Sequence, residues 1–242
     1  MEPMNSNSVF FVKLRLNNYG PFLGPNELVF DRHRTVIIGK GGTGKTIIAN
    51  ALSALGPAAG IKPSINAEHS AMSAEVVTRG DRELVKKYRD LIFLGCGTGA
   101  WFVINQETIF SEMLKGHQRK TVTEEARSIF QTMLEGKPWN IEAQKHLIPE
   151  SRSMGEQICL GYAYIFAIRK ALNLDLPAVF VSAFGLLDLK QRHGVSAFLK
   201  GQSCQQILLG TQYEFSEENE PHYRLESTGH YTKVRETTCD DR

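Results

Sequence analysis

Residues 39–46 have the types and spacing that bind phosphate. They are Gly39, Lys40, Gly41, Gly42, Thr43, Gly44, Lys45 and Thr46, and they match the pattern GxxxxGK[ST] in full. Glycines let backbone N–H groups turn inward onto phosphate oxygens. The Lys45 ammonium would neutralise charge on the β- and γ-phosphates, and the Thr46 hydroxyl would ligate Mg²⁺. The pattern predicts a site for ATP and Mg²⁺.

The segments on either side of this loop are those that phosphate binding needs. Residues 35–38 form a short segment of β-branched, mainly apolar residues, which is typical of a buried strand. The pattern of residues 45–55 predicts a helix. That helix would direct the positive end of its dipole at the same phosphates. The alternative is a glycine-rich turn without a ligand, and it leaves the combination of strand, loop and helix unexplained.

The rest of the chain predicts an α/β fold. Runs of β-branched and apolar residues predict strands, and longer periodic segments predict helices. Strands are expected over 9–16, 27–30, 71–78, 91–94, 101–104, 178–181 and 206–209, with a terminal hairpin over 222–225 and 231–235. Helices are expected over 82–88, 141–147 and 155–172, within 187–198, and from Thr121, where Glu124 completes a capping box, to 134.

Composition excludes several classes of protein. The chain has 242 residues, of which 42% are hydrophobic and 22% charged, which is ordinary for a globular protein. A net charge of +2 gives no global basic field for nucleic acid. The four cysteines are scattered, without zinc-ligand spacing, and no apolar run approaches the length of a bilayer span. We therefore expect one cytoplasmic domain over 1–242.

Residues 10–56 resemble the opening of ABC-type ATPase heads, and within that group the DNA-linked SMC/RecF/SbcC class. The resemblance rests on the strand from Phe10, the Asn18-Tyr19-Gly20 turn and the distance from this turn to the phosphate loop. It implies a P-loop NTPase head with an N-terminal antiparallel β subdomain and a short helical lobe. The head would comprise N-terminal strands and P-loop (about 9–56), a Q-loop and helical lobe (57–150) and a C-terminal part (151–242).

Residues 153–157, Ser-Met-Gly-Glu-Gln, resemble the ABC signature. The resemblance implies that Ser153, Gly155 and Glu156 bind the γ-phosphate held by an opposite subunit. A hydroxyl, a close backbone and a helix N-terminus do form an anion site. The alternative for the same residues is an ordinary helix N-cap.

The segment that begins at Phe102 resembles the Q-loop of SbcC-like heads, where a strand ends in glutamine and a helix follows. The resemblance implies that Gln106 touches Mg²⁺ and the attacking water. The alternative is a surface glutamine at a strand end. About 45 residues separate Gln106 from Ser153, without heptads, so the resemblance is to a head without a coiled-coil arm.

Residues 177–188 resemble a Walker B strand and D-loop, most like the form in DndD-type ATPases, and the resemblance places Asp188 at the nucleotide-bridged interface. The sequence departs from the family where carboxylates are expected, because Ser182 and Ala183 occupy those positions. Gln212 stands nearest to the place of the switch histidine. Since a positioned acid–base group contributes about 10²–10⁴-fold, we predict ATP binding with slow or absent hydrolysis.

Three functions follow from the resemblance. The first is an ATPase head in DNA repair or defence against foreign DNA, dimerising around ATP with a copy of itself or with a paralogous ATPase or effector subunit, and with no membrane partner. The second is a non-catalytic, ATP-dependent scaffold or regulatory subunit. The third is a transporter nucleotide-binding subunit. Residues that would form a DNA-facing surface are Arg32, His33, Arg34, Lys86, Lys87, Arg89, Lys115, Arg119 and Lys120, with scattered solvated charges as the alternative.

Overall fold

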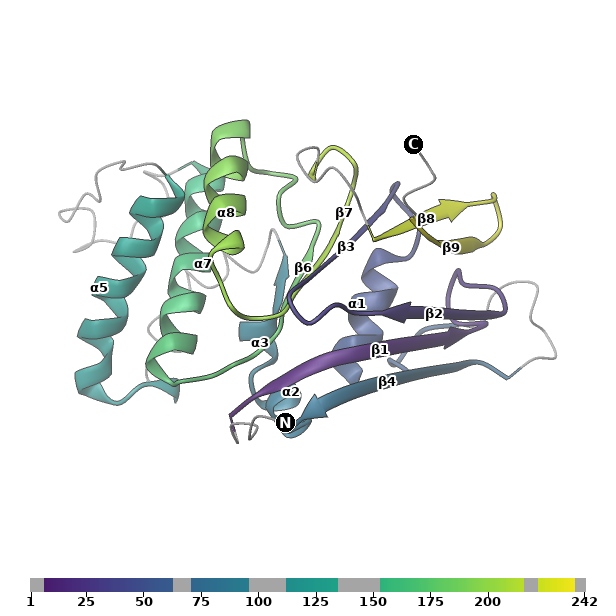
Figure 1. Ribbon diagram of the computed structural model, residues 1–242, viewed down its shortest axis with the longest axis horizontal. Coiled ribbons are helices and arrows are strands. Elements are labelled where there is room, and N and C mark those ends of the chain that lie inside the picture. The colour runs from purple at the N-terminus through teal and green to yellow at the C-terminus, as the bar shows by residue number, and fades with distance from the viewer. Residues whose placement is uncertain (1–6, 63–70, 96–111, 135–152, 216–221, 238–242) are drawn as a thin grey trace. The chain divides into compact units, whose positions relative to one another are not determined.

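The computed structural model describes residues 7–62, 71–95, 112–134, 153–215 and 222–237 (Figure 1). The chain divides into two compact units. The first comprises Met1–Phe93, Asp175–Ser182 and Cys204–Arg242, and the second comprises Leu94–Leu174 and Ala183–Ser203. The strand predicted over 101–104 and the helix predicted over 141–147 lie outside the described residues.

A six-stranded sheet has the order β5-β6-β7-β3-β8-β9, and all of it except Leu94 and Gly95 of β5 belongs to the first unit. Its strands are β3 (Arg34–Gly39), β5 (Phe93–Gly95), β6 (Ala178–Val181), β7 (Gln206–Gly210), β8 (Tyr223–Ser227) and β9 (Thr232–Glu236). Strands β6, β7, β3 and β8 are parallel, and β9 closes an antiparallel hairpin with β8. All residues of β7 are buried, which explains its continuous apolar run. The predicted strands at 35–38, 178–181 and 206–209 and the terminal hairpin are confirmed.

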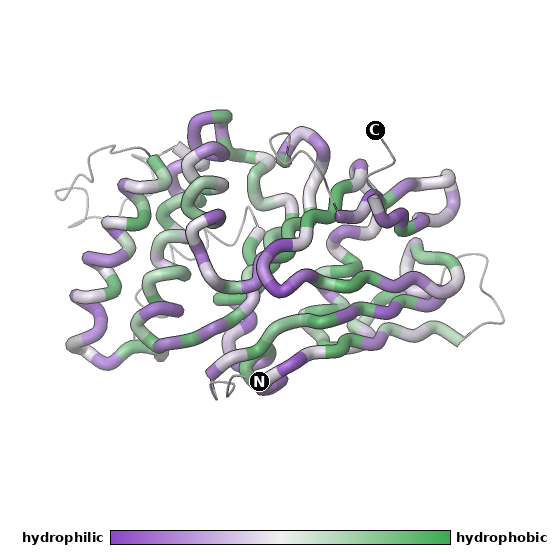
Figure 2. The backbone as a smooth tube through the Cα atoms, in the orientation of Figure 1, coloured by the Kyte–Doolittle hydropathy of each residue, from purple (hydrophilic) through white to green (hydrophobic). Residues whose placement is uncertain are grey.

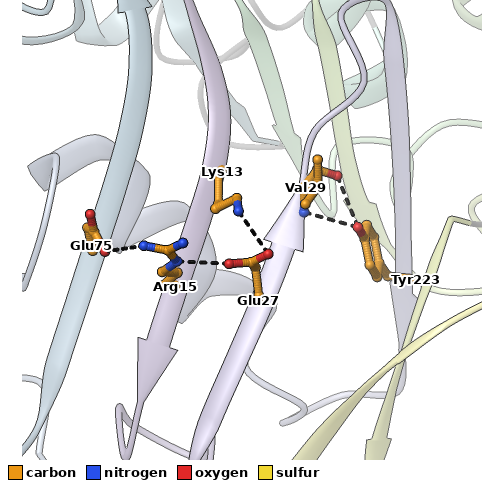
Figure 3. Close-up of polar contacts among 6 residues, drawn as sticks. All are labelled: Lys13, Arg15, Glu27, Val29, Glu75 and Tyr223. Atoms are coloured by element: carbon orange, nitrogen blue, oxygen red, sulfur yellow. Dashed lines mark hydrogen bonds and ion pairs between the residues drawn. The ribbon is translucent and has the colours of Figure 1, made fainter.

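An antiparallel sheet of three strands, with the order β2-β1-β4, forms the other layer of the first unit. Its strands are β1 (Val9–Asn17), β2 (Pro25–Val29) and β4 (Ser73–Gly80). Figure 3 shows its charged face, where Arg15 pairs with Glu27 at 2.8 Å and with Glu75 at 3.2 Å. These exposed pairs contribute about 0–1 kcal/mol each. The sheet confirms the predicted N-terminal antiparallel subdomain.

Tyr223 links the two sheets of this unit. Its hydroxyl donates to the carbonyl of Val29 at 3.1 Å and accepts from the Val29 amide at 3.0 Å, so it joins β8 to the end of β2 (Figure 3). Burial raises the pKa of Tyr223 above its ordinary value. The phenol therefore stays neutral and keeps the proton that the first of these hydrogen bonds requires.

Helix α1 (Lys45–Ala54) follows the phosphate loop as predicted and contacts both β4 and β6, one strand from each sheet. Two short helices follow β4, α2 (Glu83–Lys87) and α3 (Arg89–Ile92). The strand predicted over 91–94 is therefore wrong at Leu91 and Ile92, which are helical. Both side chains are buried, and a short buried apolar run does not distinguish helix from strand.

The second unit is built around three helices, α5 (Gly116–Met133), α7 (Met154–Ala171) and α8 (Leu189–Lys200), each of which contacts the other two (Figure 1). Figure 2 shows hydrophilic and hydrophobic residues alternating along α5, as expected for an amphipathic helix. The capping box predicted at Thr121 is wrong, because α5 already begins at Gly116. Gln118 accepts from the Lys115 amide at 2.9 Å there, and Thr121 lies inside the helix. None of the described helices has the length and apolarity to cross a membrane.

Gly194 lets α8 approach α5 closely, and its replacement by alanine should weaken this unit. An added Cβ would overlap the carbonyl oxygen of Met133, which is backbone and cannot rotate away. Forcing volume into such a contact costs about 1–3 kcal/mol. We expect Gly194→Ala to lower the midpoint of urea unfolding, followed by circular dichroism. Gly201→Ala is the matched control, since its Cβ would lie 3.4 Å from the nearest atom, and an equal loss in both variants would contradict this account.

Candidate functional site

The phosphate loop leaves β3 at Gly39 and enters α1 at Lys45, which confirms the predicted strand–loop–helix order. Gly42 and Gly44 have φ angles of 80° and 91°, in the left-handed region that glycine adopts without strain. A Cβ on Gly44 would also lie 2.8 Å from Pro21 and 2.9 Å from Phe22. Backbone conformation and close packing therefore both require glycine at this position.

Lys45 lies buried under the loop. Its ammonium donates to the carbonyl oxygens of Gly39 and Lys40, both at 2.8 Å. Burial lowers the pKa of Lys45 below its ordinary value, and the carboxylate of Glu214 opposes this effect by its charge. Phosphate oxygens would be stronger acceptors than the two carbonyls, because they carry negative charge that attracts the ammonium. The geometry suits a lysine that exchanges carbonyls for phosphates.

Thr46 is exposed on the first turn of α1, where its hydroxyl is accessible to a metal ion. Within the described residues, no three acidic, histidine or cysteine side chains gather into a metal site. Mg²⁺ commonly binds through one or two protein oxygens together with substrate phosphates, so the residues present fit a metal that arrives with ATP. Gln106, the other predicted Mg²⁺ residue, lies outside the described residues.

A hollow of about 850 Å³ opens beside the phosphate loop. Its walls come from the loop, from the turn after β7 and from β8. They include Lys40, Gly41, Thr211, Gln212, Tyr213 and Arg224. Gln212, which the sequence placed nearest to the position of the switch histidine, accepts from Arg224 at 3.3 Å and lines this hollow together with the loop. The volume is within the range of small-ligand pockets, about 300–1,000 Å³.

Ser182 follows the end of β6, on the same edge of the sheet as the phosphate loop. Val181 faces Leu209 on β7, and the Ser182 amide donates to the Leu209 carbonyl at 2.8 Å. Ser182 has a φ of 48°, which is uncommon for a residue with a side chain and marks a tight turn out of the strand. The next residue, Ala183, is fully buried. Neither side chain can supply a carboxylate here.

Glu214 lies in the turn that borders the hollow, and the sequence reasoning missed it. It lies four residues after β7 and is 7% exposed. Its Oε1 accepts from the Thr211 amide at 3.1 Å, while its own amide donates to the Thr211 hydroxyl at 3.3 Å. The signal was present in the sequence, because Thr-x-x-Glu directly after a buried strand has capping-box spacing.

The signature residues belong to the second unit. Ser153 is the N-cap of α7, where its hydroxyl accepts from the Glu156 amide at 3.2 Å and Glu156 accepts from the Ser153 amide at 3.2 Å. Asp188 caps α8 in the same way and accepts from the Gln191 amide at 2.8 Å. The N-cap alternative is therefore observed for Ser153, and the role in phosphate binding stays a prediction.

Gly155 brings the two capped helix ends together. A Cβ on Gly155 would overlap the side chain of Gln191, so the N-termini of α7 and α8 lie side by side. The structure thus gathers the predicted residues into two groups. One group is the phosphate loop in the first unit, and the other is Ser153, Gly155, Glu156 and Asp188 in the second.

Comparison with solved structures identifies proteins of similar fold. No protein-family model and no curated protein matches the chain. The SMC head domain from Thermotoga maritima is 17% identical, with a TM-score of 0.61, over 94% of this chain and 99% of that one. The Smc head bound to the C-winged helix domain of ScpA is 13% identical, with a TM-score of 0.64, over 96% and 99%. A cobalt transport ATP-binding protein is 17% identical, with a TM-score of 0.52, over 91% and 78%.

These similarities agree with the two sheets, the phosphate loop and the helical unit described above. The SMC heads match almost from end to end, whereas 78% of the transport protein is covered. The chain therefore has the fold of an ABC-type P-loop NTPase head, as predicted, and is similar in fold to SMC heads.

Proposed function

We propose that this chain is an ATP-binding SMC/RecF-like head that associates with a second subunit when Mg-ATP is bound. The observation that carries the proposal is the phosphate loop. It lies between a buried strand and a helix, with its lysine held beneath it and an exposed threonine on the next turn. Each of these features suits nucleotide phosphates and Mg²⁺.

The second unit offers a surface for such an association. Met154, Leu186 and Leu189 are 53%, 57% and 63% exposed, and they flank the capped ends of α7 and α8. Large exposed apolar side chains that gather at one place favour a protein contact. The adjoining helix N-termini favour an anion, so a second subunit that presents bound ATP would satisfy both features. A copy of this chain or a paralogous subunit has the required chemistry.

Hydrolysis by this chain alone should be slow, since Ser182 and Ala183 replace the Walker B carboxylates. ATP would then act chiefly by favouring the associated state, because a ligand shifts an equilibrium through its differential affinity for the two states. A non-catalytic scaffold is the second function that this observation supports.

A role in DNA repair or defence rests on the family resemblance. Several basic residues considered for a DNA surface are paired with acids in the structure, among them Arg32 with Asp175 at 3.1 Å and Lys86 with Glu83 at 2.9 Å. These pairs leave less free positive charge for phosphates. We therefore propose DNA as a partner on the ground of the family resemblance alone.

The test is light scattering of the chain with and without Mg-ATP, with phosphate release measured in the same samples. We expect the mass to double with Mg-ATP and phosphate release to stay near background. Lys45→Ala should remain at the monomer mass under both conditions. Steady phosphate release by the wild type that is lost in Lys45→Ala would contradict the non-hydrolysing scaffold. An equal molar mass with and without Mg-ATP would contradict nucleotide-dependent association.

A further inference from the structure

The sheet edge beside the phosphate loop has a carboxylate at an unexpected place. The resemblance to ABC-type heads implies a metal-holding acid at the end of β6, where this chain has Ser182. Strand β7 lies between β6 and β3, and Glu214 stands in the turn that follows β7. The replacement acid would thus come from the neighbouring strand, one position nearer to the phosphate loop.

Strand register brings this turn level with the phosphate loop. Ile38 of β3 faces Gly210 of β7 in a parallel pair, so the chain leaves both strands at the same height. Gly39 begins the loop on one side, and Thr211 begins the turn on the other. Both residues line the hollow described above.

The turn holds Glu214 in one position. Reciprocal hydrogen bonds join Glu214 to Thr211, and Phe215 donates its amide to the Thr211 carbonyl at 3.3 Å. The Phe215 ring is buried against Gly210, where an added Cβ would overlap it. A buried carboxylate fixed in the turn beside the phosphate loop meets the requirement that a metal ligand be preorganised.

Charge links Glu214 to the phosphate loop. Its carboxylate opposes the lowering of the Lys45 pKa that burial causes, which agrees with the register of β3 and β7 in placing the turn beside the loop. A fixed anion there would also repel the phosphates of a nucleotide. Mg²⁺ removes that repulsion, because it binds carboxylate and phosphate oxygens together.

We propose that Glu214, directly or through a metal-bound water, supplies the carboxylate for Mg²⁺ that Ser182 does not. The inference rests on the proposed nucleotide site and names a residue of it. Thr46 and Glu214 would then provide the protein oxygens described here, and the nucleotide phosphates would provide others.

The test compares the wild-type chain with Glu214→Gln by titrating a fluorescent N-methylanthraniloyl ATP in excess Mg²⁺ and in EDTA. Glutamine can keep the capping box, since its amide oxygen accepts from Thr211, so the variant removes chiefly the charge. We expect Mg²⁺ to tighten binding to the wild type and this gain to fall about tenfold or more in Glu214→Gln. Affinity in EDTA should stay equal or rise.

Glu75→Gln is the control, because it removes one acid from an exposed strand of the same unit, and it should retain the full Mg²⁺ effect. An unchanged Mg²⁺ gain in Glu214→Gln would overturn the inference. If Glu214→Gln bound the nucleotide more tightly than the wild type by the same factor in Mg²⁺ and in EDTA, the inference would also be overturned. Glu214 would then act only through its charge and not as a metal ligand. A wild-type chain that binds no nucleotide would instead contradict the proposed function.

A second measurement needs no variant and remains decisive if Glu214→Gln fails to fold. Fe²⁺ replaces Mg²⁺ in the presence of the nucleotide, and ascorbate with peroxide then cuts the backbone near the metal. We expect cuts within 211–215 as well as at 45–46. Cuts at 45–46 and 181–183 without any at 211–215 would place the metal beside Ser182 and overturn the inference.

Discussion

Replacing Lys45 by alanine is expected to lower the affinity for Mg-ATP by about 100-fold. The ammonium donates at 2.8 Å to the carbonyls of Gly39 and Lys40, and phosphate oxygens would take their place. Loss of a buried partner to a charged group costs about 3 kcal/mol or more, and each 1.4 kcal/mol is tenfold in affinity. Titration calorimetry with a slowly hydrolysed ATP analogue would measure the change.

The fold should tolerate this substitution, because burial already disfavours the charged form of Lys45 when no phosphate is present. Lys40→Ala is a suitable control. Its side chain is exposed, and its loss should weaken binding by about threefold, as expected for a solvated charge. Equal affinities in the wild type and Lys45→Ala would mean that the loop does not hold the phosphates.

Gln205→Leu is expected to destabilise the first unit by about 4 kcal/mol, the largest effect on stability that we predict. Gln205 is 1% exposed and uses both ends of its amide. Its oxygen accepts from the Phe11 amide at 2.9 Å, and its nitrogen donates to the carbonyls of Phe11 at 2.8 Å and Asp31 at 2.9 Å. Leucine has a similar volume but would remove these partners from the buried amide and carbonyl of Phe11, at about 1–3 kcal/mol each, and from the partly buried carbonyl of Asp31.

Urea unfolding followed by circular dichroism would measure this loss, and hydrogen exchange would locate it. We expect the Phe11 amide to be protected in the wild type and to exchange much faster in Gln205→Leu. Gln202→Leu is the control, since Gln202 makes one long hydrogen bond of 3.4 Å to Phe198 and should lose less than about 1 kcal/mol. Similar losses in both variants would show that the Gln205 bridge contributes little.

Local signals in the sequence predicted most of the described elements. The strands at 35–38, 178–181 and 206–209 were found because buried parallel strands are apolar throughout and are bounded by turn residues. Leu91 and Ile92 were misassigned because burial alone decides neither helix nor strand. The start of α5 was missed because Lys115 is an unusual residue before a helix, whereas Thr121 and Glu124 matched a familiar spacing inside it.

The site could be predicted where its residues adjoin in sequence and not where they meet through the fold. Residues 39–46 form one continuous motif. The turn that holds Glu214 lies beside the phosphate loop because β7 pairs with β3, and Gln205 bonds to Phe11 across the same unit. The Thr-x-x-Glu spacing marks the turn itself, but no local pattern shows which strand lies beside it or that Gln205 meets Phe11. The close fit of Gly155 against Gln191 likewise depends on the packing of two helices that are distant in sequence.

The position of β3 in its sheet has a consequence for how the chain folds as it is made. Both neighbours of β3 in the sheet, β7 and β8, begin at residue 206 or later. The ribosome therefore synthesises residues 39–46 long before it synthesises β7 and β8, the two strands that pair with β3. Contacts between such distant segments also close slowly. A nascent chain that ends before β7 should carry the whole 39–46 motif and still have no affinity for ATP.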